Sequence, residues 1–382
     1  MENRRLNLKE NSIIVVKVGT STITYSNGKL NLNYCDKLVR QLSDLRNQGK
    51  KVILVASGAI GAGLGKLNLQ KKPELTTEKQ ALAAVGQGIL IQHFEKLFAE
   101  YGHTIAQILL TRDDIANRKS YLYARQTIQT LLSYGVVPII NENDTVATDE
   151  IEFGDNDTLS ALVASSIDAD LLVLMTDIHG LYTKDPYKHP EEAEFIPEIK
   201  KITPEVEALS EVSHDRRGTG GMKSKIQAAK IATSSGVPMV IVHGKDPALL
   251  QDIINDEEVG TLFYPAKKTL NCRRRWIAFA ELSQGKIYID DGAKEAIIKA
   301  NRSLLPSGIK KVKGNFDRYQ VISICDSRGN IIGKGITNYS SQEINKIKGL
   351  HSTEIKPALG YDGGSEALHR DNFVIFENEE VV

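Results

Sequence analysis

The chain has 382 residues, more than the roughly 250 to 300 at which a single hydrophobic core stops growing, so we expect two domains. Lysine plus arginine and aspartate plus glutamate each number 48, which excludes a net charge that would draw the whole molecule to nucleic acid or an anionic membrane. The cysteines form no Cys-x-x-Cys pair, and neither a signal peptide nor a membrane-spanning apolar run is present, so we expect a cytoplasmic protein without membrane partners.

Six short runs rich in Val, Ile and Leu are continuously apolar, as strands buried on both faces must be. These runs are residues 13–18, 52–55, 104–110, 136–140, 171–175 and 237–242. Helical patterns lie between them, for example from Leu38 to Leu45 and from Ala81 to Phe98. This alternation predicts an α/β fold with a parallel sheet covered by helices, in three layers.

The pattern changes after residues 260–263. The basic segment Arg273 to Arg275 leads into shorter runs separated by glycine turns, with one helix expected around Ala293 to Lys299. We therefore predict a small, mostly β second domain. The expected boundaries are 1–270 for the larger domain, 271–281 for a linker, 282–361 for the smaller domain and 362–382 for a C-terminal tail.

Ligands of open parallel sheets bind beyond the carboxyl ends of the strands, so the residues there are the candidate site. Lys17 follows four apolar residues on a buried strand, and its charge would face a large desolvation cost unless an anion met it. Ser57 and Gly58 follow the second strand, Asp144 the fourth, and Thr176 with Asp177 the fifth. Glycines, hydroxyls and acids thus gather on one rim.

Two further segments carry unusual polar residues. Asp155, Asn156 and Asp157 stand in a row before an apolar helical stretch, and N-capping explains only one of them. The second segment opens another helical pattern with two lysines, which oppose the helix dipole unless a phosphate binds there. Its residues are Thr219, Gly220, Gly221, Met222, Lys223, Ser224 and Lys225. No Walker A loop or strict G-x-G-x-x-G fingerprint is present.

In order along the chain, these segments resemble the motifs of the amino acid kinase family, and the match covers most of the sequence. The motifs include 17–21, 57–60, 84–88, 138–144, 154–157, 180–186 and 218–222. Residues 282–359 resemble a PUA domain through 285–293, 303–309 and 312–316, although Asp317 to Gln320 stands where many PUA domains have a Gly-Asp turn.

The resemblance implies a role for each candidate residue. Lys17 and Lys225 would contact the phosphates of ATP, and Asp157 would orient both lysines. Residues Thr176, Asp177 and 219–225 would bind the nucleotide. Ser57 with Gly58, Asp144 and Asn156 would hold the amino acid substrate. From the charges of the side chains, we expect Asp144 or Asp155 to bind its ammonium group, and Asn156 with Ser57 and Gly58 to bind its α-carboxylate.

Within the family, the motifs favour members that phosphorylate the γ-carboxylate of L-glutamate for proline synthesis. That carboxylate has a pKa of about 4.3 and is ionised at neutral pH, so no general base is needed. Two lysines and the Mg²⁺ that accompanies ATP would neutralise the repulsion between the two anions. Because Mg²⁺ keeps much of its hydration, we assign it no protein ligand.

The same resemblance implies proline as a feedback inhibitor, glutamyl phosphate reductase as a possible partner, and a homo-oligomer, either a dimer or a tetramer. We place proline sensitivity in residues 145–153 and a lid in residues 214–221. Two alternatives remain. One is another family member acting on aspartate, acetylglutamate, carbamate or a nucleotide monophosphate. The other is an RNA-binding factor acting through the PUA-like domain, which the equal numbers of acidic and basic residues from Glu281 to Val382 disfavour.

Overall fold

The computed structural model describes residues 6, 8–69, 73–147, 156–186, 188–212, 221–266, 272–280, 283–300, 302–361, 363–377 and 380–381. It divides into two compact units, one made of Met1–Ile115 and Lys119–Lys267, the other of Ala116–Arg118 and Lys268–Val382. None of the helices described is long and apolar enough to cross a membrane.

The first unit is built on an 8-stranded sheet in the order β3-β4-β2-β1-β5-β9-β10-β8. The six predicted strands are present as β1 (Ile13–Val18), β2 (Lys51–Ala56), β3 (Ile105–Leu110), β4 (Val137–Glu142), β5 (Leu171–Thr176) and β9 (Met239–His243). All six run parallel. Two short strands that the sequence analysis did not predict extend the sheet. β10 (Thr261–Phe263) runs antiparallel to β9, and β8 (Glu198–Ile199) pairs with β10.

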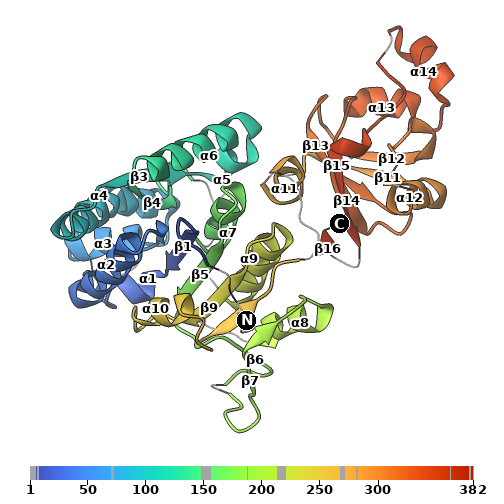
Figure 1. Cartoon of the computed structure of the whole chain (residues 1–382). Helices are drawn as coiled ribbons and strands as arrows, with labels where there is room; N and C mark the ends of the chain where they lie inside the picture. The colour runs from blue at the N-terminus through green and yellow to red at the C-terminus, as the bar shows by residue number, and fades with distance from the viewer. Residues whose placement is uncertain are drawn as a thin grey trace. The chain divides into compact units, whose positions relative to one another are not determined.

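Helices cover both faces of this sheet, so the predicted three-layer fold is confirmed (Figure 1). On one face, α2 (Leu32–Asn47), α4 (Thr76–Glu100) and α10 (Leu249–Ile254) share a buried cluster with the strands. On the other, α7 (Asn156–Ser166) packs on β1 and β5, and α9 (Met222–Ser234) packs on β9 and α7. The remaining helices of the unit are α1 (Thr20–Ile23), α3 (Ala59–Lys66), α5 (Arg112–Ala116), α6 (Arg118–Ser133) and α8 (Pro204–Val212), and β6 (Leu181–Tyr182) pairs with β7 (Phe195–Ile196).

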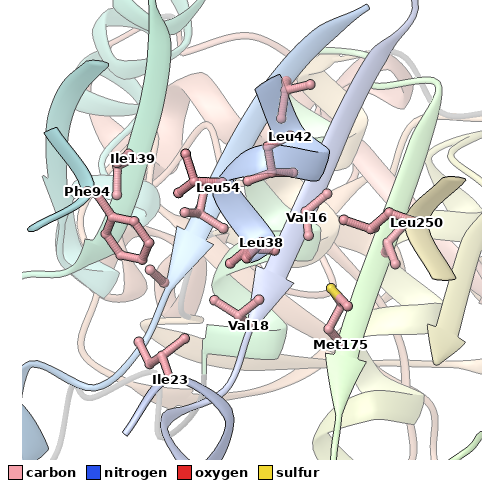
Figure 2. Close-up of a cluster of buried hydrophobic side chains, with 14 of the residues drawn as sticks. Val16, Val18, Ile23, Leu38, Leu42, Leu54, Phe94, Ile139, Met175 and Leu250 are labelled. Atoms are coloured by element: carbon pink, nitrogen blue, oxygen red, sulfur yellow. The ribbon is translucent and has the colours of Figure 1, made fainter. Parts of the chain in front are cut away.

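The alternation of side chains along β1 decides what each layer receives. Figure 2 shows Leu38 and Leu42 of α2 against Val16 and Val18 of β1, whose side chains are fully buried. Because successive side chains of a strand point to opposite faces, Lys17 points to the other layer. That layer contains α7 and α9.

Two glycines let α3 and α4 cross at very short range. A Cβ at Gly86 would lie 1.7 Å from the carbonyl oxygen of Ala59, and one at Gly63 would lie 2.0 Å from that of Leu82. No side chain fits at such distances, so only glycine allows this crossing. The crossing fixes the segment after β2 against the middle of α4.

The second unit contains a 6-stranded sheet in the order β12-β11-β13-β14-β15-β16, as the predicted mostly β domain requires. Its strands are β11 (Gly285–Ile289), β12 (Ile309–Gly314), β13 (Val321–Cys325), β14 (Ile331–Ile336), β15 (Phe373–Glu377) and β16 (Glu380–Val381). The helix expected near Ala293 is α12 (Asp291–Ile298), and the unit also contains α11 (Cys272–Arg275), α13 (Ser341–Ile347) and α14 (Ser352–Leu359). A capping box between Ser340 and Glu343 begins α13.

Candidate functional site

Lys17 lies near the carboxyl end of β1 with only 5% of its surface exposed. Its ammonium group forms an ion pair with Oδ1 of Asp157, in the first turn of α7. Asp157 is completely buried. A buried ammonium group needs a partner of opposite charge, and the alternation of β1 brings Lys17 to the helix that supplies one.

Lys225 reaches the same carboxylate from α9. Its Nζ lies 3.2 Å from Asp157 Oδ2, and the lysine is 4% exposed. Ser224 places its hydroxyl 3.2 Å from the same oxygen and 2.8 Å from the carbonyl oxygen of Gly221. Two ammonium groups share one carboxylate, so these three side chains carry a net charge of +1 in a buried place. Such an arrangement favours an incoming anion.

The two helices that carry Asp157 and Lys225 are packed closely. Both helices contain small buried residues, among them Ala161 and Ala164 of α7 and Ala228 and Ala232 of α9, and the two helices contact each other along their length. At the far end of the pair, Ser165 donates a 2.7 Å hydrogen bond to Ser235. Close packing of this kind holds the two charged groups at a fixed separation.

A chain of side-chain hydrogen bonds joins Ser57 to α4. Asn156 Nδ2 lies 2.8 Å from Ser57 Oγ and 2.8 Å from Asn141 Oδ1. Asn141 Nδ2 in turn donates to Gln87 Oε1 at 2.8 Å. The candidate residues Ser57 and Asn156 are thus in direct contact, whereas Asn141 and Gln87 were absent from the predicted site residues. Both stand inside motifs of the sequence, but their partners are 15 and 54 residues away, so no local pattern reveals the pairing.

A pocket of about 310 Å³ opens beside this chain, and the candidate residue Asp144 lines it. Its other lining residues come from α4, β3 and the end of β4: Ala83, Ala84, Gln87, Gly88, Gln107, Leu109, Glu142, Asn143 and Thr145. Carboxylates and amides therefore face a space of the size that a small amino acid needs. Gly58 precedes α3 with φ of 103°, a conformation that favours glycine.

Thr176 is the last residue of β5, the strand that pairs with β1 on the side opposite β2, and Asp177 follows it. The Thr176 hydroxyl donates to Asp177 Oδ1 at 2.9 Å, and the Gly244 amide donates to the Thr176 carbonyl at 2.5 Å. The rings of His179 and His243 lie 4.4 Å apart nearby. Burial lowers the pKa of His243, electrostatic interaction with His179 and Lys245 lowers it further, and Asp177 opposes them.

The remaining candidates lie around the start of α9 or outside the described residues. Gly221 is the N-cap of α9, Met222 is buried and Lys223 is exposed. Asp155, Thr219 and Gly220 fall outside the described residues, as do most of the expected lid and of the expected proline-sensitive loop. Among the residues described, no three His, Cys, Asp or Glu side chains cluster as metal ligands would, and the carboxylate of Asp157 is engaged by two lysines.

A model of the amino acid kinase family matches residues 12–243, and a model of the PUA domain matches residues 285–359. Glutamate 5-kinase of Thermoanaerobacter sp. is 52% identical over 369 residues, which cover 96% of this chain and 98% of that protein. Glutamate 5-kinase of Caldanaerobacter subterraneus is 51% identical with the same coverage. Among solved structures, carbamate kinase from Giardia lamblia bound to AMP-PNP is 17% identical with a TM-score of 0.49, covering 67% of this chain and 99% of that one.

Proposed function

This chain belongs to the glutamate 5-kinase branch of the amino acid kinase family, and we propose that it transfers the γ-phosphoryl group of ATP to the γ-carboxylate of L-glutamate. The product is L-glutamyl 5-phosphate, in the first step of proline biosynthesis. One observation carries the proposal at the level of chemistry. Two buried lysines share one aspartate, and hydrogen bonds from the neighbouring Asn156 lead through Asn141 to Gln87, in a pocket lined by carboxylates and amides.

The reaction needs no general base. The γ-carboxylate has a pKa of about 4.3, so its oxygen is already an anionic nucleophile at neutral pH. The barrier comes from bringing this anion to the γ-phosphoryl group, which is also anionic. Catalysis then depends on alignment of the reactants and on neutralisation of charge.

Lys17 and Lys225 supply that neutralisation. Their ammonium groups lie on different oxygens of one carboxylate, so they approach the reacting centre from different elements, β1 and α9. Asp157 holds both groups in place and offsets only one of their two positive charges. Mg²⁺ enters with ATP and adds positive charge on the phosphates; no protein ligand is assigned to it.

The amino acid occupies the pocket between α4 and β4. Asp144 and Glu142, which line it, offer carboxylates to the substrate ammonium group. Ser57 lies at the inner end of the hydrogen-bond network, in contact with Asn156, the residue that precedes Asp157 in sequence. Thr176, Asp177 and the start of α9 serve the nucleotide. Proline inhibition, transfer of the product to a reductase, assembly into a dimer or tetramer and a cytoplasmic location are part of the same proposal, supported by the relationship to the branch.

The test is to trap the acyl phosphate. Protein, MgATP and L-glutamate are incubated with hydroxylamine, and the γ-glutamyl hydroxamate is measured against a reaction without ATP. We expect ATP-dependent hydroxamate with glutamate and little with aspartate or acetylglutamate. Hydroxamate with aspartate, or phosphorylation of acetylglutamate, together with background signal for glutamate, would assign the chain to another reaction of the family.

A further inference from the structure

We infer that Gln87, on α4, binds the α-carboxylate of the amino acid substrate and that the amide chain behind it fixes the direction in which its NH₂ group points. This inference rests on the proposed function and names a specificity residue for it. The orientation of the Gln87 side-chain amide decides which of its atoms is free for the substrate. The main-chain amide of Glu142 sets that orientation through Asn141.

The main-chain amide of Glu142 fixes the orientation of the first amide in the chain. A backbone N–H can only donate, and this one lies 2.9 Å from the side chain of Asn141. The atom that receives it must be Oδ1, so the NH₂ group of Asn141 is the end that faces Gln87, 2.8 Å away. The atom of Gln87 at that contact must accept and is therefore Oε1.

The NH₂ group of Gln87 consequently points away from Asn141. Among the described residues, its Nε2 has no hydrogen-bond partner, and the residue lines the pocket. An amide NH₂ group offers two donors and no acceptor. It suits a carboxylate and does not suit an ammonium group.

Asn156 is in the opposite position. Its two N–H donors point to Ser57 Oγ and to Asn141 Oδ1, so neither is left for a substrate carboxylate. Ser57 accepts one of these bonds and keeps its own O–H to donate. The donors that the site presents to the substrate are therefore the hydroxyl of Ser57 and the NH₂ group of Gln87.

Position separates the roles of the two substrate carboxylates. The γ-carboxylate must reach the phosphoryl group beside Lys17 and Lys225, and Asn156, adjacent to Asp157 in the chain, lies at that end. Gln87 is two hydrogen-bonded links further away, where the pocket also contains Glu142 and Asp144. The α-carboxylate and the α-ammonium group of the substrate fit this outer end.

The decisive variant is Gln87→Glu, tested with two substrates. A glutamate at this position can still accept from Asn141, so the amide chain is kept, but it replaces the donors with negative charge. The second substrate is the α-amide of glutamate, which retains the γ-carboxylate and the ammonium group and lacks only the α-carboxylate. Both are assayed with MgATP by release of ADP.

In the wild type, we expect kcat/KM to favour glutamate over its α-amide by about 10- to 100-fold, as for loss of a hydrogen bond to a charged group. Gln87→Glu should raise the KM for glutamate at least about tenfold, leave the KM for ATP within about twofold, and lower the preference for glutamate over the α-amide by at least about tenfold. If the role of Gln87 were purely structural, the variant would lower kcat/KM equally for glutamate and for its α-amide, and the preference would be unchanged. That result would overturn the inference.

The matched control is Gln107→Glu, which places the same charge in the same pocket, on β3, outside the amide chain. If it lowered the preference as much as Gln87→Glu does, general repulsion would account for the result and the assignment of Gln87 would be wrong. Failure of the proposed function is a separate outcome, because the wild type would then phosphorylate neither substrate. Binding of L-glutamate to the wild type and to Gln87→Glu by calorimetry provides a readout that does not depend on turnover.

Discussion

Lys17 on β1 and Asp157 on α7 form an ion pair whose side chains are 7% and 0% exposed. Moving two such ions out of water costs several kcal/mol for each, and one ion pair seldom stabilises a fold more than apolar residues of the same volume would. Here Lys225 adds a second positive charge to the same carboxylate. Because this arrangement contributes little to stability, we interpret it as a binding site for anionic ligands.

Replacing either lysine should therefore affect turnover more than folding. We expect Lys17→Ala or Lys225→Ala to lower kcat by about 100- to 1,000-fold, the size of effect seen when one electrostatic donor is removed from a reacting centre. Lys50→Ala is the matched control, because Lys50 is also buried but donates to the carbonyl of Lys9 at the opposite end of the sheet. Steady-state kinetics with hydroxamate detection measures all three. Turnover within threefold of the wild type in Lys17→Ala would contradict the assignment.

Removing the shared aspartate should make the thermal stability of the protein depend more strongly on bound nucleotide. Asp157→Asn removes the carboxylate that two buried ammonium groups share, and breaking a buried ion pair in this way costs about 3–5 kcal/mol. Phosphates can replace the missing charge, so MgADP should raise the Tm more in the variant than in the wild type. Differential scanning fluorimetry over a range of MgADP concentrations gives both shifts. Equal shifts would show that the phosphates do not approach these lysines.

The crossing of α3 and α4 should tolerate no Cβ at Gly86. Gly86→Ala places that atom 1.7 Å from the Ala59 carbonyl oxygen, and we expect a loss of unfolding free energy of about 1–3 kcal/mol or more. Gly88→Ala, two residues along α4, meets no atom within 4 Å and should be neutral or stabilising by up to about 1 kcal/mol. Urea unfolding of both variants tests the difference. Equal stabilities would mean that the helices can separate at little cost.

Stability should fall as the solution becomes mildly acidic. Burial lowers the pKa of His93, with Lys96 adding to the effect, and burial also lowers the pKa of His103, with Arg46 adding to it while a backbone hydrogen bond at Ser43 opposes it. The unfolded chain then binds more protons than the folded one below the ordinary value of 6.5, so stability present above that pH is lost as the pH falls. We expect the Tm to decrease between pH 7.5 and 5.5. The control is His189→Gln, which removes an exposed imidazole. The decrease in Tm should be smaller in His93→Gln than in this control.

In the C-terminal unit, we expect the carboxylate of Glu343 to contribute to the pH dependence of the Tm. Arg318 forms an ion pair with Glu343 and lowers the pKa of the Glu343 carboxyl to about 2. Burial opposes this shift, and hydrogen bonds from Ser340 and Tyr361 add to it. Because the folded-state pKa lies below the ordinary 4.5, the stabilisation exists above that pH and disappears as the pH falls towards about 2. Glu343→Gln should lower the Tm of this unit at pH 7 and remove that part of the acid dependence. A Tm identical to the wild type at pH 7 would contradict the role of the pair.

The sequence predicted the central sheet well because strands buried on both faces leave continuous apolar runs. It missed β8 and β10, whose 2 and 3 residues are too few to carry a pattern. In the second unit, it missed α13, although the Ser340–Glu343 capping box was readable as a helix start. Short elements at the edges of sheets depend on neighbours that are distant in sequence.

The candidate site shows the same division. Lys17, Asp157 and Lys225 are conspicuous because charges in apolar surroundings need an explanation, and the structure brings them together. Gln87 and Asn141 gave no such signal, because a neutral amide on a helix or a strand end is unremarkable until its partner is known. Their hydrogen bonds link α4 with β4, and β4 with α7, which only the folded chain makes neighbours.

The shared carboxylate of Asp157 also has a kinetic meaning. Water around a free lysine must reorient when a phosphate arrives, and that reorganisation would recur with every substrate molecule. In this protein the ammonium groups of Lys17 and Lys225 lose their water when the chain folds, and the packing of α7 against α9 keeps them there. Each catalytic cycle would then begin with dipoles and charges already aligned, so the solvent contributes little to the height of the barrier.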